Sequence, residues 1–235
     1  RLFGEDYRER GPDLRSRVGF VHEVPSYYRS LSVARTGKVL GGFYPRWDQT
    51  RFLELCSDFG LAPGKRVGHL SHGMRTRLGL ALALSHEAEL LLLDEPSSGL
   101  DPGFRRDLLE RLSALVRGGA VSVLFSTHIT SDLDRIADFV TFLKDGEVVF
   151  SESREAVLDR WKLVQGGPEL ARADVSYLLA GWVEGDLGVS GLTARLPEVV
   201  SALGADSVAA RPATLEDVVF YTGRSGRGGL KLHDR

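Results

Sequence analysis

The sequence predicts an α/β protein whose main sheet is parallel, followed by a small α+β appendage. Two short apolar runs, at residues 90–93 and 121–126, have the length of strands, and amphipathic helical patterns alternate with them. Strands that helices cover on both faces read as continuous apolar runs, and both segments are expected to be buried in this way. A chain of 235 residues is long enough for one large domain and an appendage.

The elements before residue 90 are predicted from periodicity and capping residues. Residues 1–6 read as the end of a strand and a turn, and residues 16–21 form a short strand. A helix covers residues 31–40, and Asp48 caps the next helix, which ends at Pro63-Gly64. Ser71 caps a third helix, which runs to about residue 86.

The elements after residue 94 alternate in the same way. A helix over residues 104–117 stops at Gly118-Gly119, and a shorter helix lies near residues 131–137. Asp145-Gly146 is typical of a two-residue hairpin turn, here between strands at 140–144 and 147–150.

The C-terminal region has a weaker pattern. Residues 163–169 read as a glycine-containing linker, followed by strands within 182–189 and helices over 197–203 and 214–221. We therefore expect a first, α/β domain at 1–162, an accessory domain at 163–222 and a disordered tail at 223–235.

Composition excludes several classes of protein. The 30 basic and 32 acidic residues nearly balance, so the basic face of a nucleic-acid-binding protein is not expected. The single cysteine, Cys56, forms neither an intrachain disulfide nor a zinc cluster, and its helical apolar pattern favours a buried side chain over a nucleophile. No apolar run approaches the ~18 residues of a spanning helix, and no signal peptide is recognisable. A membrane role is therefore expected to be peripheral, through a partner.

The strongest chemical signal is Leu-Leu-Leu-Asp-Glu-Pro at residues 91–96. A buried strand that ends in Asp94 and Glu95 places both acids at the carboxyl edge of a parallel sheet, where ligands of such folds bind. Their side chains point in different directions, so one can hold Mg²⁺ and the other can orient or deprotonate a water molecule. Alone, this segment is also consistent with a strand that ends in two solvated acids.

Three further segments accompany it in order. Leu70-Ser71-His72-Gly73-Met74 opens a helix, and a hydroxyl, a glycine and a helix N-terminus together can bind an anion. Taken alone, the segment is better explained as an ordinary capped helix. Ser98-Gly99-Leu100-Asp101 and Ser126-Thr127-His128 follow the two buried strands.

This ordered set resembles the nucleotide-binding domain of ABC transporters, over residues 1–150. Residues 70–74 resemble the signature segment LSGGQ, residues 91–95 the Walker B strand, residues 98–101 the D-loop, and His128 the switch histidine. The resemblance implies a P-loop NTPase-like fold with a helical subdomain, and it implies ATP and Mg²⁺ as ligands.

The resemblance also implies roles for individual residues. Asp94 would support Mg²⁺, Glu95 would polarise the attacking water, and His128 would contact the γ-phosphate. Ser71 and Gly73 would touch ATP bound by a second ATPase subunit, and Asp101 would couple the two sites of such a dimer.

Two segments depart from the family pattern. Glu23 stands where the family has the glutamine that contacts cation and nucleotide, and its charge alters the electrostatics at the metal. In the signature segment, His72 and Met74 replace glycine and glutamine. Such replacements in the signature segment are found in the branch of the family that serves ABC-2-type exporters. Two further segments resemble the same branch: residues 43–48 and Thr-Leu-Glu-Asp at 214–217.

The phosphate-binding loop, G-x-x-x-x-G-K-[ST], is missing from the 235 residues. Gly37-Lys38 and Gly64-Lys65 are followed by Val39 and Arg66, and neither has the upstream glycine. In this family the loop precedes the region around residues 1–5. We therefore expect the loop to lie upstream of Arg1 and this chain alone to be inactive.

The expected function is that of an ATP-hydrolysing subunit on the cytoplasmic face of the cell membrane, which powers a separate membrane-spanning permease, with export as the expected direction. The alternative is a non-hydrolysing regulatory or degenerate module of the same fold, which would usually lose Glu95 or His128. A soluble relative acting on DNA or ribosomes would show coiled-coil heptads, a zinc cluster or a second ATPase domain, and the sequence shows none of these. Independent binding by the C-terminal region stays open.

Overall fold

The structure is a computed structural model that describes residues 1–185 and 188–223. The chain separates into two compact units, Arg1–His128 and Ile129–Arg235. The domain boundary expected between residues 162 and 163 lies inside the second unit and stays a prediction. Except for Gly223, the predicted disordered tail lies outside the described residues.

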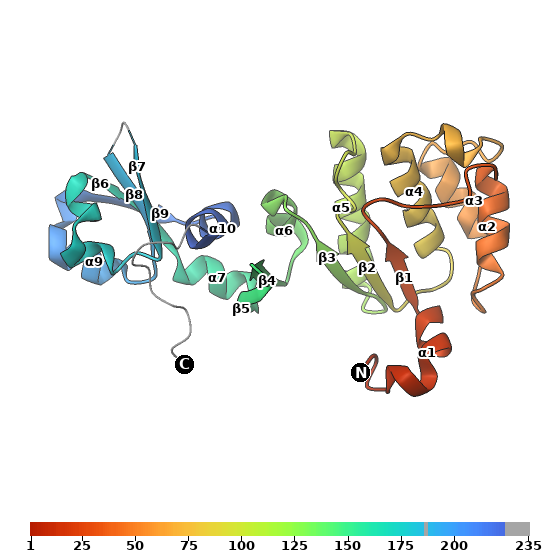
Figure 1. Cartoon of the computed structure of the whole chain (residues 1–235), viewed down its shortest axis with the longest axis horizontal. Helices are drawn as coiled ribbons and strands as arrows, with labels where there is room; N and C mark the ends of the chain where they lie inside the picture. The colour runs from red at the N-terminus through yellow and green to blue at the C-terminus, as the bar shows by residue number, and fades with distance from the viewer. Residues whose placement is uncertain (186–187, 224–235) are drawn as a thin grey trace. The chain divides into compact units, whose positions relative to one another are not determined.

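The first unit is built on a parallel sheet of three strands, shown in Figure 1. Strand β2 (Leu90–Asp94) lies between β1 (Val18–Val21) and β3 (Ser122–Ser126). Val21 pairs with Leu93, and Leu93 pairs with Phe125, so the three carboxyl ends lie side by side. The predicted α/β class is confirmed, as are the three strands to within two residues.

The two faces of this sheet differ in burial. Leu91 and Leu93 are buried on the face that Ala83 of α4 covers, since a Cβ on Gly19 of β1 would meet both Leu91 and Ala83. On the other face Phe20, Leu92 and Leu124 share one register row, and Phe20 and Leu124 are 55% and 66% exposed. The prediction that 121–126 is a buried strand is therefore wrong for the described residues, because its side chains alternate between half-buried and exposed.

The first unit contains five α-helices. They are α1 (Tyr7–Ser16), α2 (Val33–Gly41), α3 (Gln49–Asp58), α4 (His72–Ala83) and α5 (Pro102–Arg117), with a 3₁₀ turn at Val67–His69. Capping side chains set several starts: Ser32, Asp48, Ser71 and Asp101 each accept a backbone N–H at the beginning of a helix. The predicted caps at Asp48 and Ser71 are confirmed.

Helices α2, α3 and α4 pack on one another as the predicted helical subdomain. Phe52 of α3 lies where a Cβ on Gly37 would stand, with 2.2 Å to the nearest ring carbon, and Trp47 covers Gly41 in the same way. These glycines therefore let α2 approach the aromatic side chains closely. Cys56 is fully buried in this layer, as predicted, and burial raises the pKa of its thiol to about 12.

The second unit contains a hairpin and an antiparallel sheet. Strands β4 (Phe139–Lys144) and β5 (Glu147–Ser153) pair around Asp145 and Gly146, both with positive φ as a two-residue turn requires, which confirms the predicted hairpin. The sheet has the order β7-β8-β6-β9. Its strands are β6 (Lys162–Gly166), β7 (Gly181–Gly185), β8 (Gly188–Thr193) and β9 (Val208–Pro212).

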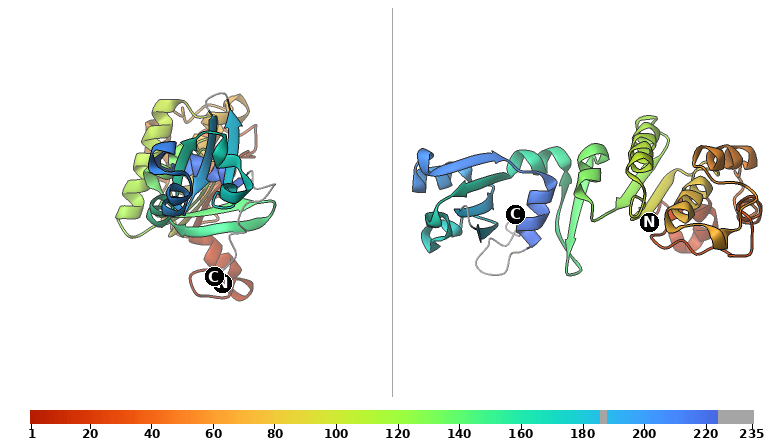
Figure 2. Two further views of the ribbon diagram at one scale, coloured as in Figure 1. Left: turned by 90° about the vertical axis from the view of Figure 1, so that its left-hand side faces the viewer. Right: turned by 90° about the horizontal axis from the view of Figure 1, so that it is seen from above.

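The helices of this unit are α6 (Thr130–Ile136), α7 (Arg154–Arg160), α8 (Ala173–Ser176), α9 (Leu196–Leu203) and α10 (Leu215–Gly223). Two apolar clusters hold the unit together, one containing Trp161 and Tyr221, the other containing Val164 and Val199. Figure 2 shows the sheet and its helices from two further sides. The predicted linker at 163–169 is wrong, because β6 is an inner strand of this sheet and Leu163 and Val164 are buried.

Candidate functional site

Polar residues follow all three strands of the first unit at the carboxyl edge of the sheet. Asp94 ends β2 and pairs in register with Ser126, the last residue of β3. Because Val21 pairs with Leu93, the segment His22-Glu23 leaves β1 at the same edge. Parallel strands thus bring the predicted residues Glu23, Asp94, Glu95 and His128 to one side of the sheet.

The Asp94 carboxylate is oriented by the neighbouring strand. The hydroxyl of Ser126 donates a hydrogen bond of 2.8 Å to Asp94 Oδ1 and lies 3.3 Å from the carbonyl oxygen of Leu93. A carboxylate held in this way at a partly exposed edge is suited to bind a hard cation.

Glu95 adopts a left-handed backbone conformation, with φ +47°. Its N–H donates to the carbonyl of Ser126 (3.0 Å), which fixes the turn out of β2 against the end of β3. This conformation costs free energy for any residue other than glycine, and such strained residues cluster at functional sites.

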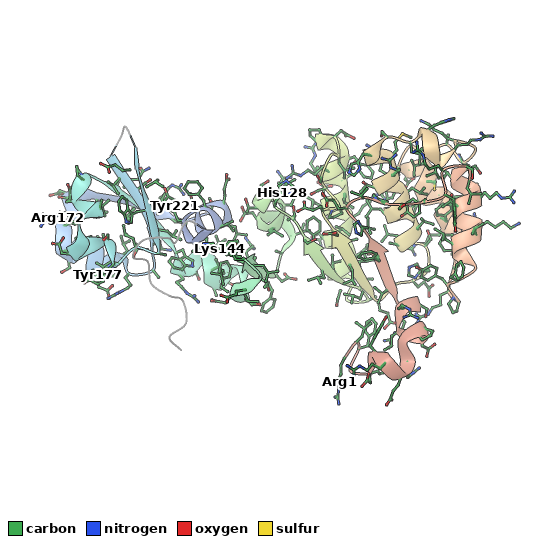
Figure 3. All side chains as sticks on the ribbon, viewed as in Figure 1. Arg1, His128, Lys144, Arg172, Tyr177 and Tyr221 are labelled. Atoms are coloured by element: carbon green, nitrogen blue, oxygen red, sulfur yellow. The ribbon has the colours of Figure 1, made fainter. Side chains whose placement is uncertain are left out.

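The Glu95 carboxylate contacts His128, which lies two residues after β3 and is labelled in Figure 3. Oε1 accepts the backbone N–H of His128 at 2.9 Å, and Oε2 lies 2.8 Å from His128 Nδ1. The Glu95 side chain is only 18% exposed, whereas the His128 side chain is 72% exposed. Glu95 is thus held by two contacts with His128, whose imidazole is exposed. A carboxylate in this position can orient a water molecule next to a ligand that contacts the imidazole.

The signature segment lies against the D-loop. Ser71 Oγ accepts the N–H of Met74 (3.2 Å) as the cap of α4. A Cβ on Gly73 would stand 3.2 Å from the carbonyl oxygen of Gly99, and one on Gly99 (φ +68°) would stand 3.1 Å from the His72 ring. Both positions thus favour glycine, Gly73 because the D-loop backbone is close and Gly99 because of its φ.

The D-loop itself is held between α4 and α5. Asp101 Oδ1 accepts the N–H of Phe104 (2.9 Å) as the cap of α5, and Oδ2 forms an ion pair with Arg77 of α4. The hydrogen bond from Phe104 and the charge of Arg77 hold the pKa of Asp101 below its usual value.

Glu23 lies at the same edge, exposed, in the segment after β1. Within residues 1–185 and 188–223, no three His, Cys, Asp or Glu side chains gather closely enough to hold a metal ion by themselves. One or two carboxylates are nevertheless a fitting set for Mg²⁺, which usually takes its remaining ligands from phosphate and water. The oriented carboxylate of Asp94 fits such a site.

Two functional candidates carried no signal in the sequence. Arg77 was one of many charged helical residues, and only its ion pair with Asp101 distinguishes it. The hydroxyl of Tyr27 lies 2.9 Å from the position that a Cβ on Gly79 of α4 would occupy. Tyr27 therefore packs the segment after Glu23 closely against the signature helix. Burial, and to a lesser extent Tyr44, raises the pKa of Tyr27 to about 12.

The ABC transporter family matches residues 1–98, and an AAA domain family described as putative AbiEii toxin, type IV TA system, matches residues 64–133. A solved structure described as the ATP-binding subunit of an ABC transporter superposes with a TM-score of 0.61 at 24% identity, over 66% of this chain and 67% of that chain. This likeness shows the fold.

A relative by sequence decides the family. A fluoroquinolones export ATP-binding protein of Mycobacterium tuberculosis is 31% identical over 238 residues, which cover 95% of this chain and 73% of that protein. The chain belongs to the ABC transporter ATP-binding family.

Other members of the family match over shorter stretches. The bacitracin transport ATP-binding protein BcrA of Enterococcus faecalis is 34% identical over 151 residues, covering 63% of this chain and 49% of that protein. An uncharacterized ABC transporter ATP-binding protein of Bacillus subtilis, YxlF, is 32% identical over 78% of this chain and 61% of its own length. The chain thus spans about half to three fifths of these two relatives. Among the described residues, no helix is both long and apolar enough to cross a membrane.

Proposed function

We propose that this chain is part of an ATP-binding and ATP-hydrolysing subunit of an ABC exporter. The observation that carries the proposal is the contact between Glu95 and His128 beside the oriented carboxylate of Asp94. Relatives named for bacitracin transport and fluoroquinolones export support a role in export.

In this proposal each site residue has one task. Asp94, assisted by Glu23, would hold Mg²⁺, which would supply positive charge to neutralise the phosphates. Glu95 orients the attacking water and takes its proton, and His128 contacts the γ-phosphate. Ser71 and Gly73 bind the ATP of a second ATPase subunit, and the D-loop with Asp101 links the two sites. No segment of residues 1–235 has the pattern of the loop that cradles the phosphates, so the proposal assigns that task to none of them.

The second subunit and a permease are the proposed partners. A solved structure described as a dimeric post-hydrolysis state of an ATP-binding cassette bound to ADP and Pi, with a TM-score of 0.56, supports dimerisation. Exposed apolar side chains after Glu23 and on α2 offer a surface for a membrane-embedded permease: Val24, Tyr28, Val39 and Phe43 are between 42% and 76% exposed. We therefore place the protein on the cytoplasmic face of the membrane, with residues 1–162 as the ATPase domain and 163–222 as an accessory domain.

Replacing Glu95 by glutamine in the full-length protein tests the hydrolytic role. Glutamine keeps the shape of the side chain but cannot accept a proton, so we expect ATP turnover to fall by about 100- to 10,000-fold. ATP binding, measured with a fluorescent analogue, should persist. Glu87→Gln is the matched control, because Glu87 is also an acid with positive φ but is exposed at the opposite end of β2.

Undiminished hydrolysis in Glu95→Gln would remove Glu95 from the catalytic role. Absent hydrolysis and absent ATP binding in the unmutated full-length protein would instead favour a non-hydrolysing module. The presence of both Glu95 and His128 in mutual contact argues for hydrolysis.

A further inference from the structure

Arg77 of α4 is the side chain that joins the signature helix to the D-loop. Its guanidinium forms the ion pair with Asp101, and Nη1 donates to the carbonyl oxygen of Phe59 at 3.2 Å. Phe59 directly follows α3, so one guanidinium connects α3, α4 and the D-loop.

Aromatic rings fix the orientation of this guanidinium. Arg77 Cζ lies 4.0 Å from the centre of the Phe104 ring at the start of α5, within the range of a cation–π contact. Phe104 meets Phe59 edge to face, with 5.2 Å between ring centres and an angle of 90°. The Arg77 side chain is only 23% exposed, so its charge is largely shielded from water and directed at Asp101.

The D-loop is thereby attached to α4 at both of its ends. At one end Gly99 lies against the ring of His72, and Gly73 faces the carbonyl of Gly99. At the other end Asp101 is held by Arg77, while its second oxygen caps α5. The signature segment and the D-loop therefore form one body within a single chain.

We propose that Arg77 is a positioning residue that holds the D-loop against the signature helix, so that both reach a partner subunit's ATP as one unit. This proposal rests on the proposed function for its catalytic consequence. The cap of α5 and the ion pair with Arg77 each use one oxygen of the Asp101 carboxylate, so the two contacts together fix the D-loop relative to α4 and α5.

The test compares Arg77→Met with Arg111→Met in the full-length protein. Methionine keeps an apolar stem but removes the charge and the donors. Arg111 of α5 makes contacts of the same kind: an ion pair with Asp58 (3.2 Å) and a cation–π contact 5.5 Å from the centre of the Phe59 ring. Its ion pair, however, joins α5 to α3 and does not involve the D-loop. Arg77→Lys serves as the conservative variant.

Hydrogen exchange of the amides of residues 98–101, without nucleotide, measures the attachment itself. We expect exchange there to become about tenfold faster in Arg77→Met, to stay at the unmutated rate in Arg111→Met, and to be intermediate in Arg77→Lys. In steady-state ATP hydrolysis, we expect kcat to fall about 10- to 100-fold in Arg77→Met with KM changed much less, since a misplaced group costs rate rather than binding.

Unchanged exchange at 98–101 in Arg77→Met would overturn the proposal, as would an equal loss of kcat in Arg111→Met. If Arg77→Met does not fold, Arg77→Lys decides by the same two readouts. An unmutated protein that does not hydrolyse ATP would overturn the proposed function alone, and the exchange result would still decide whether Arg77 holds the loop.

Discussion

Ser126 shows how a single hydroxyl at the end of a strand sets up the proposed cation site. It donates to Asp94 Oδ1 and belongs to the strand whose last backbone carbonyl receives the N–H of Glu95. One residue of β3 therefore aligns both acids that end β2. The proposed division of labour between Asp94 and Glu95 depends on this alignment.

Ser126→Ala removes the hydroxyl and leaves the backbone bond to Glu95 in place. Residues that orient a metal-binding carboxylate typically contribute about 10- to 100-fold to metal affinity. We expect the Mg²⁺ concentration for half-maximal ATP hydrolysis by the full-length protein to rise by at least about tenfold. Ser122→Ala, at the exposed start of the same strand, should leave this Mg²⁺ concentration unchanged. An equal response of the two variants would contradict the role of Ser126.

Most of the candidate site was predictable from the sequence, because each of its members follows or begins a regular element. Asp94 ends β2 and Glu95 follows it, and parallel strands bring their carboxyl ends together. His128 was a candidate only through its place in the ordered set of motifs that resembles the family. Arg77 and Tyr27 were not predictable, since their importance comes from contacts with Asp101 and Gly79, which belong to other elements. Local patterns carry no information on such pairs.

At the scale of elements, side-chain caps fix where helices begin. Helix α10 begins with a reciprocal cap: Thr214 Oγ1 accepts the N–H of Asp217 (3.1 Å), and Asp217 Oδ2 accepts the N–H of Thr214 (2.9 Å). Arg211 binds the same carboxylate through two nitrogens, at 2.8 and 3.1 Å. Although burial opposes it, these bonds hold the pKa of Asp217 below its usual value. The Thr-Leu-Glu-Asp segment that resembles the exporter branch therefore has a structural task.

Thr214→Ala removes half of this cap. Loss of a threonine cap typically costs about 1 kcal/mol, so we expect the free energy of opening of α10, from native-state hydrogen exchange, to fall by that amount. Ser201→Ala on the exposed side of α9 should change it by less than about 0.5 kcal/mol. A cap that contributes nothing would leave α10 equally protected in both variants.

The elements that sequence reasoning missed share a physical cause. Helix α1 contains Gly11-Pro12 and buries little besides Leu14, so it has no apolar period, and its cap, Asp6, was the one local signal. Strand β6 reads as a linker because it is short, ends in Gly166 and is followed by Gly167. Its identity comes from pairing with β8 and β9, which lie far along the chain.

At the scale of the whole molecule, we propose that two subunits together complete each ATP site. The first unit contains the two acids, His128 and the signature segment. In this proposal the signature segment binds the ATP held by the second subunit, not an ATP held by its own chain. ATP should therefore join two subunits, and hydrolysis should release them. A variant that binds ATP without hydrolysing it should accumulate in the joined state.

The mass of the full-length Glu95→Gln protein, measured by sedimentation with and without nucleotide, tests this claim most directly. We predict a dimer with ATP and Mg²⁺ and a monomer with ADP or without nucleotide, at protein concentrations where the unmutated protein with ATP is mainly monomeric. Ser71→Ala combined with Gly73→Asp in the same background should abolish the dimer, because we propose that both residues bind the partner's ATP. A Glu95→Gln protein that binds ATP yet stays monomeric would contradict the account.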